Sequence, residues 1–456
     1  MKLIKEDKRI FYNLVFPALL EVIIIRLLHI ADSVMLGQMQ DSTLAVAAVG
    51  LCGAPINLIV SVTSAFFYGT TAAVAWYYGA NEKKNMRTFA WQSMAVAAIV
   101  AVLFSVFSIL GAGPIMKFIC GSGETLTLAT SYYRIYACGF FFQILTSNIT
   151  AILRGIGITK IPLLYNITGG AINVLLNYLL IYGKWGFPEL RSDGAALATT
   201  ISMIVSFIIA ALILVFKKTD INFRLGLNKK IDSSIKTRLL PIGLTSAGEQ
   251  LILQIGAIFT SKIIAVLPTS DIAANQIVAN LEAFAWSTGA ACQVASTSLF
   301  GRSLGENNQP KAKSFLSFAV KWTLGFAFAE MLVFCLFGKQ LGMVFSNDSG
   351  IYGIITILLL ISSLSLPFIN VHQTVSGALR SAGDSIAPLI ASFISLWVFR
   401  VLLGYLTISV LDMGIYAYKW CIVADQFVRC TIVCIFYLSG HWKKFILKYR
   451  EPQSKN

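Results

Sequence analysis

The sequence predicts an all-α polytopic membrane protein with twelve transmembrane helices arranged in two six-helix lobes. Two observations support this class. The chain is 57 % hydrophobic and only 12 % charged, with a mean hydropathy of +0.75, whereas a soluble domain carries about 25 % charged residues. In addition, short sequence motifs recur at a spacing close to half the chain, which is the pattern of a duplicated membrane protein.

Apolar segments of about 20 residues, long enough to cross a bilayer core about 30 Å thick, recur from end to end. We place the twelve spans at residues 11–36, 44–76, 89–111, 126–151, 160–182, 194–216, 239–266, 272–300, 314–338, 351–377, 386–410 and 413–439. The lobes and the polar segments beside them are residues 1–216 (N-terminal lobe), 217–238 (cytoplasmic linker), 239–440 (C-terminal lobe) and 441–456 (basic cytoplasmic tail).

The internal repeat rests on three pairs of matching segments. Residues 151–163 read AILRGIGITKIPL, and residues 377–389, 226 positions later, read GALRSAGDSIAPL. Two further pairs have the same or nearly the same spacing: Gly79 and Asn81 with Gly305 and Asn307, and Pro17 with Pro241. Because each half holds an even number of spans, the lobes run the same way across the membrane, about a pseudo-two-fold axis along its normal. This organisation is typical of secondary transporters.

The basic residues predict the orientation of the chain. Alternate connections between spans, together with the two ends, hold 26 Lys and Arg residues, against six in the other connections. By the positive-inside rule, both termini are cytoplasmic and the protein is a multi-pass protein of the cell membrane. The net charge of +15 is therefore mainly a topology signal. It does not indicate nucleic-acid binding, although the linker and the tail are suited to contact anionic lipid.

Composition argues against an enzyme or a metalloprotein. The eight cysteines lie mainly within spans, where they behave as small apolar residues. The three histidines form no metal-site spacing, and there is no nucleophile motif and no P-loop. We therefore expect neither a catalytic residue nor a cofactor.

Ionisable residues within the first span point to function. Such groups cost about 2.5–3.5 kcal/mol each at membrane depth, so they normally face a cavity or a partner. The first span carries Glu21, Arg26, His29 and Asp32. At 100° per residue, Asp32 lies about 20° from Glu21 around the helix, so the two share one face. The alternatives are an interfacial Asp32 and a Glu21–Arg26 pair, although a spacing of five is poor for a helical pair.

The second half has its own deep carboxylates, Glu249 and Glu282, both near the middle of their predicted spans. Deep carboxylates attract cations, either coupling ions or organic cations. We predict that these two contact substrate. The alternative is a buried ion pair with Arg400 or Lys262.

Other polar residues within spans are less informative. Asn173 and Asn177 present two amides on one face of the fifth span, where they would either coordinate Na⁺, bond a protonated Asp or hold helices together. Asp425 and Arg429, four residues apart, are predicted to form a structural pair. Glu330 receives no role.

Several segments resemble the multidrug and toxic compound extrusion (MATE) family, in particular its NorM- and DinF-like members, over nearly the whole chain. The segments are HIADSVMLGQMQDSTLAVAAVG (29–50), the paired LRGIGITKIP and LRSAGDSIAP, NVLLNYLLIYG (173–183), DGAALATTIS (193–202) and DIAANQIVANLEAFAW (271–286). The resemblance implies a V-shaped pair of lobes that exports cationic drugs in exchange for Na⁺ or H⁺.

The resemblance also implies a cation-coupling site in the N-terminal lobe. Asp32 falls where the family carries its first-span Asp, and Asn173 matches the fifth-span Asn. Asn177 falls where some members have a second Asp, and Thr199 or Thr200 would supply a sixth-span oxygen. A Na⁺ ion would bind at Asp32, Asn173 and Asn177.

Further positions of the resemblance concern gating and the C-terminal lobe. Pro17 matches a proline associated with bending of the first helix, and we group Glu21 with it. Glu249 aligns with a seventh-span Glu, and Asn370 lies near a tenth-span Asp. Two expected acids, at Asn177 and Asn370, are therefore amides, which favours H⁺ over Na⁺ as coupling ion.

The leading hypothesis is an antiporter, coupled to H⁺ or Na⁺, that exports organic-cation drugs by alternating access and works as a monomer. The alternative within the same superfamily is a flippase for lipid-linked precursors, which usually has more spans and a cationic cavity. An intramembrane enzyme acting on lipid is the hypothesis from another class.

Overall fold

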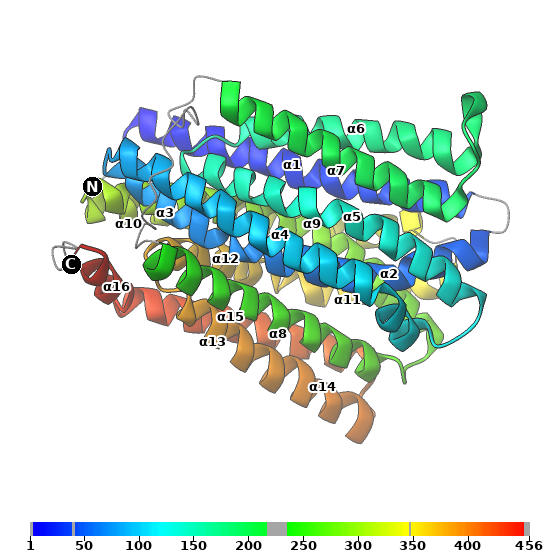
Figure 1. Cartoon of the computed structure of the whole chain (residues 1–456). Helices are drawn as coiled ribbons and strands as arrows, with labels where there is room; N and C mark the ends of the chain where they lie inside the picture. Colours follow the sequence, from blue (N-terminus) through cyan, green and yellow to red (C-terminus); the bar gives the residue numbers. More distant parts are fainter. Residues whose placement is uncertain (1–2, 39–41, 217–234, 346–347, 451–456) are drawn as a thin grey trace. The chain divides into compact units, whose positions relative to one another are not determined.

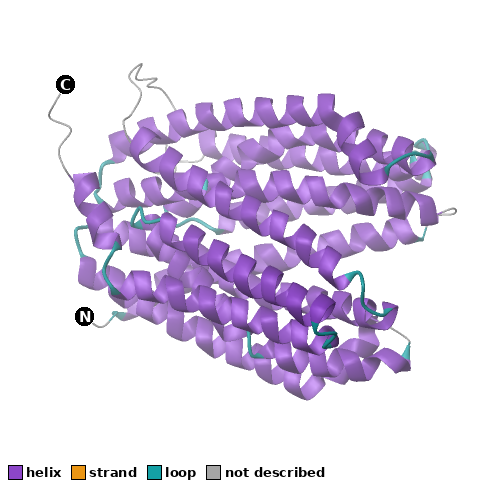
Figure 2. Ribbon diagram, turned by 90° about the horizontal axis from the view of Figure 1, so that it is seen from below, coloured by secondary structure: helices purple, strands orange, loops and turns teal. Residues whose placement is uncertain are grey.

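The computed structural model describes residues 3–38, 42–216, 235–345 and 348–450 (Figure 1). The model is 91 % helical, and no strand occurs in these ranges (Figure 2). The predicted all-α membrane fold is therefore confirmed. Most of the predicted linker and the last six residues of the predicted tail lie outside the described residues.

The helices begin and end close to the predicted span boundaries. In chain order they are α1 (Lys5–Gly37), α2 (Ser42–Phe66), α3 (Tyr68–Gly79), α4 (Lys83–Cys120), α5 (Glu124–Gly155), α6 (Lys160–Tyr182), α7 (Arg191–Phe216), α8 (Leu240–Ile264), α9 (Thr269–Gly305), α10 (Gln309–Phe345), α11 (Tyr352–Ser363), α12 (Leu366–Ser381), α13 (Ile386–Ile394), α14 (Leu403–Tyr405), α15 (Gly414–Leu438) and α16 (Trp442–Arg450). A π-helical segment, Ser395–Leu402, joins α13 to α14, and a second one, Leu406–Val410, continues α14.

The number of apolar spans agrees approximately with the prediction of twelve. Within the described residues, ten helical segments are long and apolar enough to cross a membrane, and the number is eleven if α11 and α12, which are bent by 42° at the break between them, count as one span. Helix α9 has 37 residues, which is long enough to cross, but it is less apolar. Its sequence includes Asp271, Asn275 and Glu282, together with many Ser and Thr residues.

The chain forms two compact units. The first-half unit is Leu20–Leu240, and the second-half unit is Met1–Leu19 together with Pro241–Asn456. The first 19 residues join the second-half unit because the apolar side chains of Phe11, Leu14 and Val15 pack into a buried cluster with residues of α9 and α10. The lobe boundaries given by the sequence, 1–216 and 239–440, stay a prediction.

Each unit is organised around one central helix. In the first-half unit, α5 packs against α2, α3, α4 and α7, and in the second-half unit α12 packs against α9, α10 and α15. In each unit, an equivalent hydrogen bond joins the central helix to a neighbouring helix. Thr71 Oγ1 donates to the carbonyl of Ala151 at 3.1 Å, and Thr297 Oγ1 donates to the carbonyl of Gly377 at 3.2 Å. Thr297 lies 226 positions after Thr71, and Gly377 lies 226 positions after Ala151, which is the spacing of the sequence repeat.

The turns after the repeated segments also match. Gly157 and Gly383 have φ of +84° and +96°, a left-handed conformation that favours glycine. In each turn the N–H of the next residue bonds to the carbonyl five residues earlier, at 2.8 and 2.9 Å. Asn81 and Asn307 both adopt the left-handed region, at +59° and +58°, where Asn is tolerated at helix ends. The sequence repeat is therefore a repeat of local structure.

Candidate functional site

Helices α1 and α6 run parallel and are joined by two hydrogen bonds of the same register. Asn166 Nδ2 donates to Glu21 Oε1 at 2.7 Å, and Asn177 Nδ2 donates to Asp32 Oδ1 at 2.7 Å. In each bond the two residues are 145 positions apart in the sequence. Along each helix, the two bonding residues are eleven positions apart, which is close to three helical turns. Glu21 and Asp32 thus lie on one face of α1, as their spacing indicated.

A small residue lets α1 and α6 approach between these two bonds. A Cβ atom at Gly170 of α6 would lie 2.0 Å from Leu28 Cδ1 of α1. Gly170 therefore makes room for Leu28, and the two polar pairs on either side come within hydrogen-bonding distance.

The predicted coupling residues come together around Asp32. With its amide turned so that nitrogen faces α1, Asn173 donates to Asp32 Oδ1 at 2.8 Å and accepts from Thr199 Oγ1 at 3.1 Å. The Ala195 carbonyl, 2.9 Å from Thr199 Oγ1, is a second acceptor for the single hydrogen of this hydroxyl. Asn177 is 1 % exposed, and its Oδ1 has no hydrogen-bond partner within the described part of the chain. The cluster unites one carboxylate with two amides and a hydroxyl from α1, α6 and α7.

Thr199 rather than Thr200 faces this cluster. Thr200 Oγ1 donates to the carbonyl of Ile135 on α5 at 3.0 Å, so it ties α7 to the central helix instead. This separates the two threonines that the sequence left as alternatives.

The charge on Asp32 is solvated by neutral groups. No ion pair of Asp32 occurs among the described residues, and no group of three or more His, Cys, Asp and Glu gathers anywhere in them. With Asn173 turned in this way, both amide nitrogens face the carboxylate, which stabilises its negative charge. A Na⁺ ion here would require both amides to turn their oxygens inward, whereas a proton requires only one acceptor on the neighbouring amides.

Glu21, by contrast, is bound to a cation. Its Oε2 lies 3.0 Å from Arg154 Nη2 of α5, and its side chain is 3 % exposed. The cation beside Glu21 is thus Arg154, whereas the sequence had offered Arg26 as an alternative partner. Pro17 lies one turn earlier, inside α1, and the boundary between the two units falls just after it, between residues 19 and 20. Glu21 therefore fixes α1 to α5 and α6 directly beyond that boundary.

Glu249 repeats this arrangement in the second-half unit. Its Oε2 lies 2.6 Å from Arg380 Nη2, and Ser392 Oγ donates to Oε1 at 2.9 Å. Arg154 and Arg380 are the paired arginines of the repeat, 226 positions apart. An ion pair is thus present at Glu249, but its cation is Arg380 rather than Arg400 or Lys262.

Glu282 is also paired, with Lys419 Nζ of α15 at 2.8 Å, and that lysine is only 1 % exposed. The predicted pair of Asp425 and Arg429 is present at 2.8 Å, and Arg400 completes it with a 2.7 Å contact to the other oxygen of Asp425. Both carboxylates predicted to contact substrate therefore have a cationic partner of their own.

The carboxylate that sequence reasoning left without a role is Glu330. Thr288 Oγ1 donates to its Oε1 at 2.6 Å, and Asn370 Nδ2 donates to its Oε2 at 3.3 Å. No cation pairs with Glu330 among the described residues, and Asn370 Oδ1 and both amide atoms of Gln373 are buried there without a hydrogen-bond partner. The available signal in the sequence was an acid deep within an apolar span.

These features define a class of protein. An all-helical membrane protein built from two structural repeats, each with a half-buried carboxylate among neutral polar groups, is a secondary transporter by architecture. Comparison with known families is specific: the MatE family model matches residues 17–179 and again residues 241–406, once in each half. The chain belongs to the MatE family of multidrug efflux transporters.

Individual relatives agree with this assignment. The chain is 28 % identical over 448 residues to a probable multidrug resistance protein NorM from Thermotoga maritima, covering 98 % of this chain and 96 % of the relative. A MATE crystal structure in complex with MaL6 matches with a TM-score of 0.88 at 23 % identity, covering 96 % of this chain and 97 % of that one. A multidrug resistance MATE transporter in an outward-facing conformation matches at 0.86 and 22 %, with 97 % of both chains covered. The structural matches show the same fold.

Proposed function

We propose that this protein is an antiporter of the cell membrane that exports organic cations by alternating access, driven by H⁺ or Na⁺. The observation that carries the proposal is Asp32, a carboxylate within α1 that is surrounded by Asn173, Asn177 and Thr199 and has no cationic partner among the described residues. A charge held in this way is available to an exchangeable cation, because no resident cation has to be displaced.

Competition for the charge of Asp32 couples the two fluxes. The ionised carboxylate attracts an organic cation, and a proton or Na⁺ ion at Asp32 removes that attraction. We favour the proton, because it changes the hydrogen bonding of one amide, whereas Na⁺ requires oxygens from both Asn173 and Asn177.

Helix α1 transmits the change. Pro17 lacks the N–H that would bond one turn back, so it is the point at which α1 bends most easily. Glu21 holds the next turn to Arg154 and Asn166. Bending of α1 between Pro17 and Glu21 alters the direction of the segment that carries Asp32.

In the second-half unit, Glu249 and Glu282 remain proposed substrate contacts. Each must exchange its partner, Arg380 or Lys419, for the substrate. Glu330 needs no such exchange and is therefore a further candidate for the charge that attracts an organic cation. We place both termini in the cytoplasm and expect a single chain to be sufficient for transport.

The test is ethidium efflux from liposomes that contain the purified protein, with a proton gradient and a sodium gradient imposed separately. Efflux driven by the proton gradient alone supports Asp32 as a protonation switch. Efflux driven only by sodium supports a coordination site at Asp32, Asn173 and Asn177. Absence of efflux under both gradients would contradict the drug-export proposal and would favour the lipid-linked precursor flippase.

A further inference from the structure

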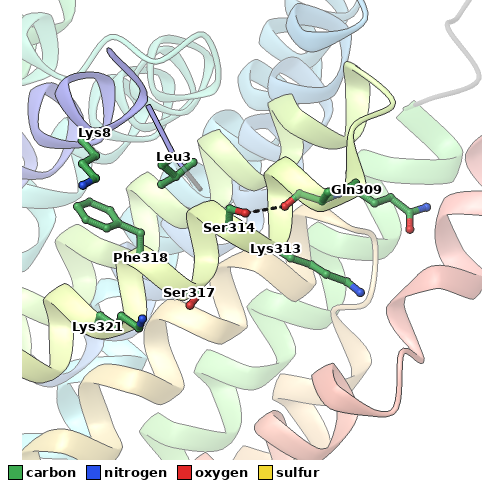
Figure 3. A pocket seen from close by; sticks show the side chains of 9 residues that line it. Leu3, Lys8, Gln309, Lys313, Ser314, Ser317, Phe318 and Lys321 are labelled. Atoms are coloured by element: carbon green, nitrogen blue, oxygen red, sulfur yellow. Dashed lines mark hydrogen bonds between the residues drawn. The ribbon is translucent and has the colours of Figure 1, made fainter. Parts of the chain in front are cut away.

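A basic pocket of about 680 Å³ lies between the N-terminal ends of α1 and α10, within the second-half unit (Figure 3). Lys8 of α1 and Lys313 and Lys321 of α10 line it, and no acidic residue does. All three lysines are exposed, so the pocket is open to a ligand.

No acidic side chain of the described residues pairs with the lysines of this pocket. The neighbouring acids are used elsewhere, because Lys311 lies 3.8 Å from Asp7 and 3.0 Å from Glu306. Three ammonium groups facing one cavity repel one another, and an anion placed among them would relieve that repulsion.

The spacing of the cationic groups suits a phosphate-bearing ligand. Lys313, Ser317 and Lys321 follow one another at intervals of four on one face of α10, so the two ammonium groups flank a hydroxyl over about 12 Å of helix. Lys8 closes the pocket from α1, with its Nζ 5.7 Å from the centre of the Phe318 ring (Figure 3). Ammonium and hydroxyl donors from two helices are suitable ligands for phosphate oxygens.

An aromatic surface continues from the pocket along the same two helices. Phe16 of α1 lies 6.0 Å from Trp322 of α10, and Trp322 stacks on Phe326 at 4.2 Å between ring centres. Phe16 is 46 % exposed. Aromatic side chains below a cluster of lysines are typical of the membrane–water interface, where the lysines meet headgroups and the rings meet acyl chains. A soluble phosphate has no acyl chain that would contact such a surface.

The depth along α10 agrees with a lipid ligand. Helix α10 has 37 residues and is about 55 Å long, so it exceeds the bilayer core by about 25 Å. Lys313 and Lys321 lie about 6 and 18 Å from its start, which corresponds to the headgroup region and its inner edge.

We propose that this pocket is a binding site for the phosphate headgroup of an anionic phospholipid, whose acyl chains lie along the aromatic surface. The bound lipid bridges α1 and α10 on the side of Pro17 that belongs to the second-half unit. It therefore holds the start of α1 in place while the rest of the helix moves. The site is independent of the coupling ion.

The experiment compares binding of phosphatidylglycerol and phosphatidylcholine with identical acyl chains to the purified full-length protein, by native mass spectrometry and by the shift in melting temperature. The test variant is K8Q/K313Q/K321Q. The matched control is K83Q/K84Q/R87Q, which removes three charges from the start of α4, the equivalent helix of the other repeat. A third variant, K8R/K313R/K321R, keeps the charge.

Wild type, control and arginine variant are expected to bind phosphatidylglycerol about ten-fold or more in preference to phosphatidylcholine, and the glutamine variant is expected to lose that preference. Single variants K313Q and K321Q give intermediate losses and keep the test valid if the triple variant does not fold. Equal preference in the glutamine variant and the wild type would overturn the proposal. Displacement of phosphatidylglycerol by millimolar inorganic phosphate would reassign the pocket to a soluble phosphate.

Discussion

Two carboxylates within the spans of each half can be compared: one pairs with an arginine of the repeat, and the other has no ion pair among the described residues. The two unpaired members of this comparison lie on different helices. Glu21 and Glu249 pair with the two arginines of the repeat. In the first-half unit the unpaired acid is Asp32, on the same helix as Glu21, whereas in the second-half unit it is Glu330, on α10. Duplication has therefore kept the ion pair that supports each unit, and the acid available to a cation has diverged.

The divergence suggests different tasks. Asp32 shares α1 with Pro17, so a change in its charge acts on the helix that spans the unit boundary. Glu330 lies against Thr288 and Asn370 inside one unit, and the kink of its own helix, at Phe337, does not fall at a unit boundary. We expect Asp32 to couple transport and Glu330 to contribute mainly to the attraction of substrate.

The largest expected effect is that of Asp32→Asn, which we predict lowers ethidium efflux about 100-fold or more while leaving expression intact. The variant removes the exchangeable charge but keeps a side chain of the same size among the amides. Efflux from liposomes is the measurement, with the exposed Glu189→Gln as control. Efflux at the wild-type rate in Asp32→Asn would remove Asp32 from the mechanism.

Breaking the second-half ion pair comes next. Arg380→Met leaves the buried carboxylate of Glu249 without a cation and should lower the free energy of unfolding by about 3–5 kcal/mol. Arg154→Met should lower the free energy of unfolding by less, because the Arg154 side chain is 22 % exposed and that of Arg380 is 4 % exposed. Denaturant unfolding in detergent gives both values. A larger loss for Arg154→Met would contradict the burial argument.

A smaller structural difference between the repeats concerns Gly377, whose counterpart is Ala151. A Cβ atom at Gly377 would lie 2.6 Å from the Gln293 carbonyl oxygen, which is a backbone atom and cannot swing aside. Gly377→Ala should therefore destabilise the protein by about 1–3 kcal/mol. The control is Gly325→Ala in α10, where a Cβ would meet nothing within 4 Å and the better helix former should be neutral or stabilising by up to about 1 kcal/mol. Equal melting temperatures for the two variants would show that the helices separate freely.

The smallest effect is expected for Glu330→Gln, which we predict raises the KM for ethidium about five-fold, equivalent to about 1 kcal/mol, with coupling retained. The neutral amide keeps an oxygen that accepts from Thr288, and its nitrogen can donate to Asn370 once the Asn370 amide turns, but it lacks the charge. Transport rates over a range of ethidium concentrations, under each gradient, separate affinity from coupling. Complete loss of efflux would instead give Glu330 the same task as Asp32.

Periodicity and spacing predicted much of this arrangement. Glu21 and Asp32 are eleven positions apart, which corresponds to three helical turns, and in the structure both residues face α6. The Asp425–Arg429 pair likewise follows from a spacing of four within one helix. Such predictions succeed because helical geometry alone determines which side chains share a face.

The sequence by itself determined the helical membrane fold, the repeat at a spacing of 226 and the cluster that a family resemblance indicated around Asp32. Only the tertiary structure decided which partner each acid meets. Glu249 and Arg380 are 131 residues apart and Glu330 and Asn370 are 40 apart, and each pair lies on different helices. Such contacts depend on how helices pack and rotate against one another, and neither composition nor periodicity contains that information.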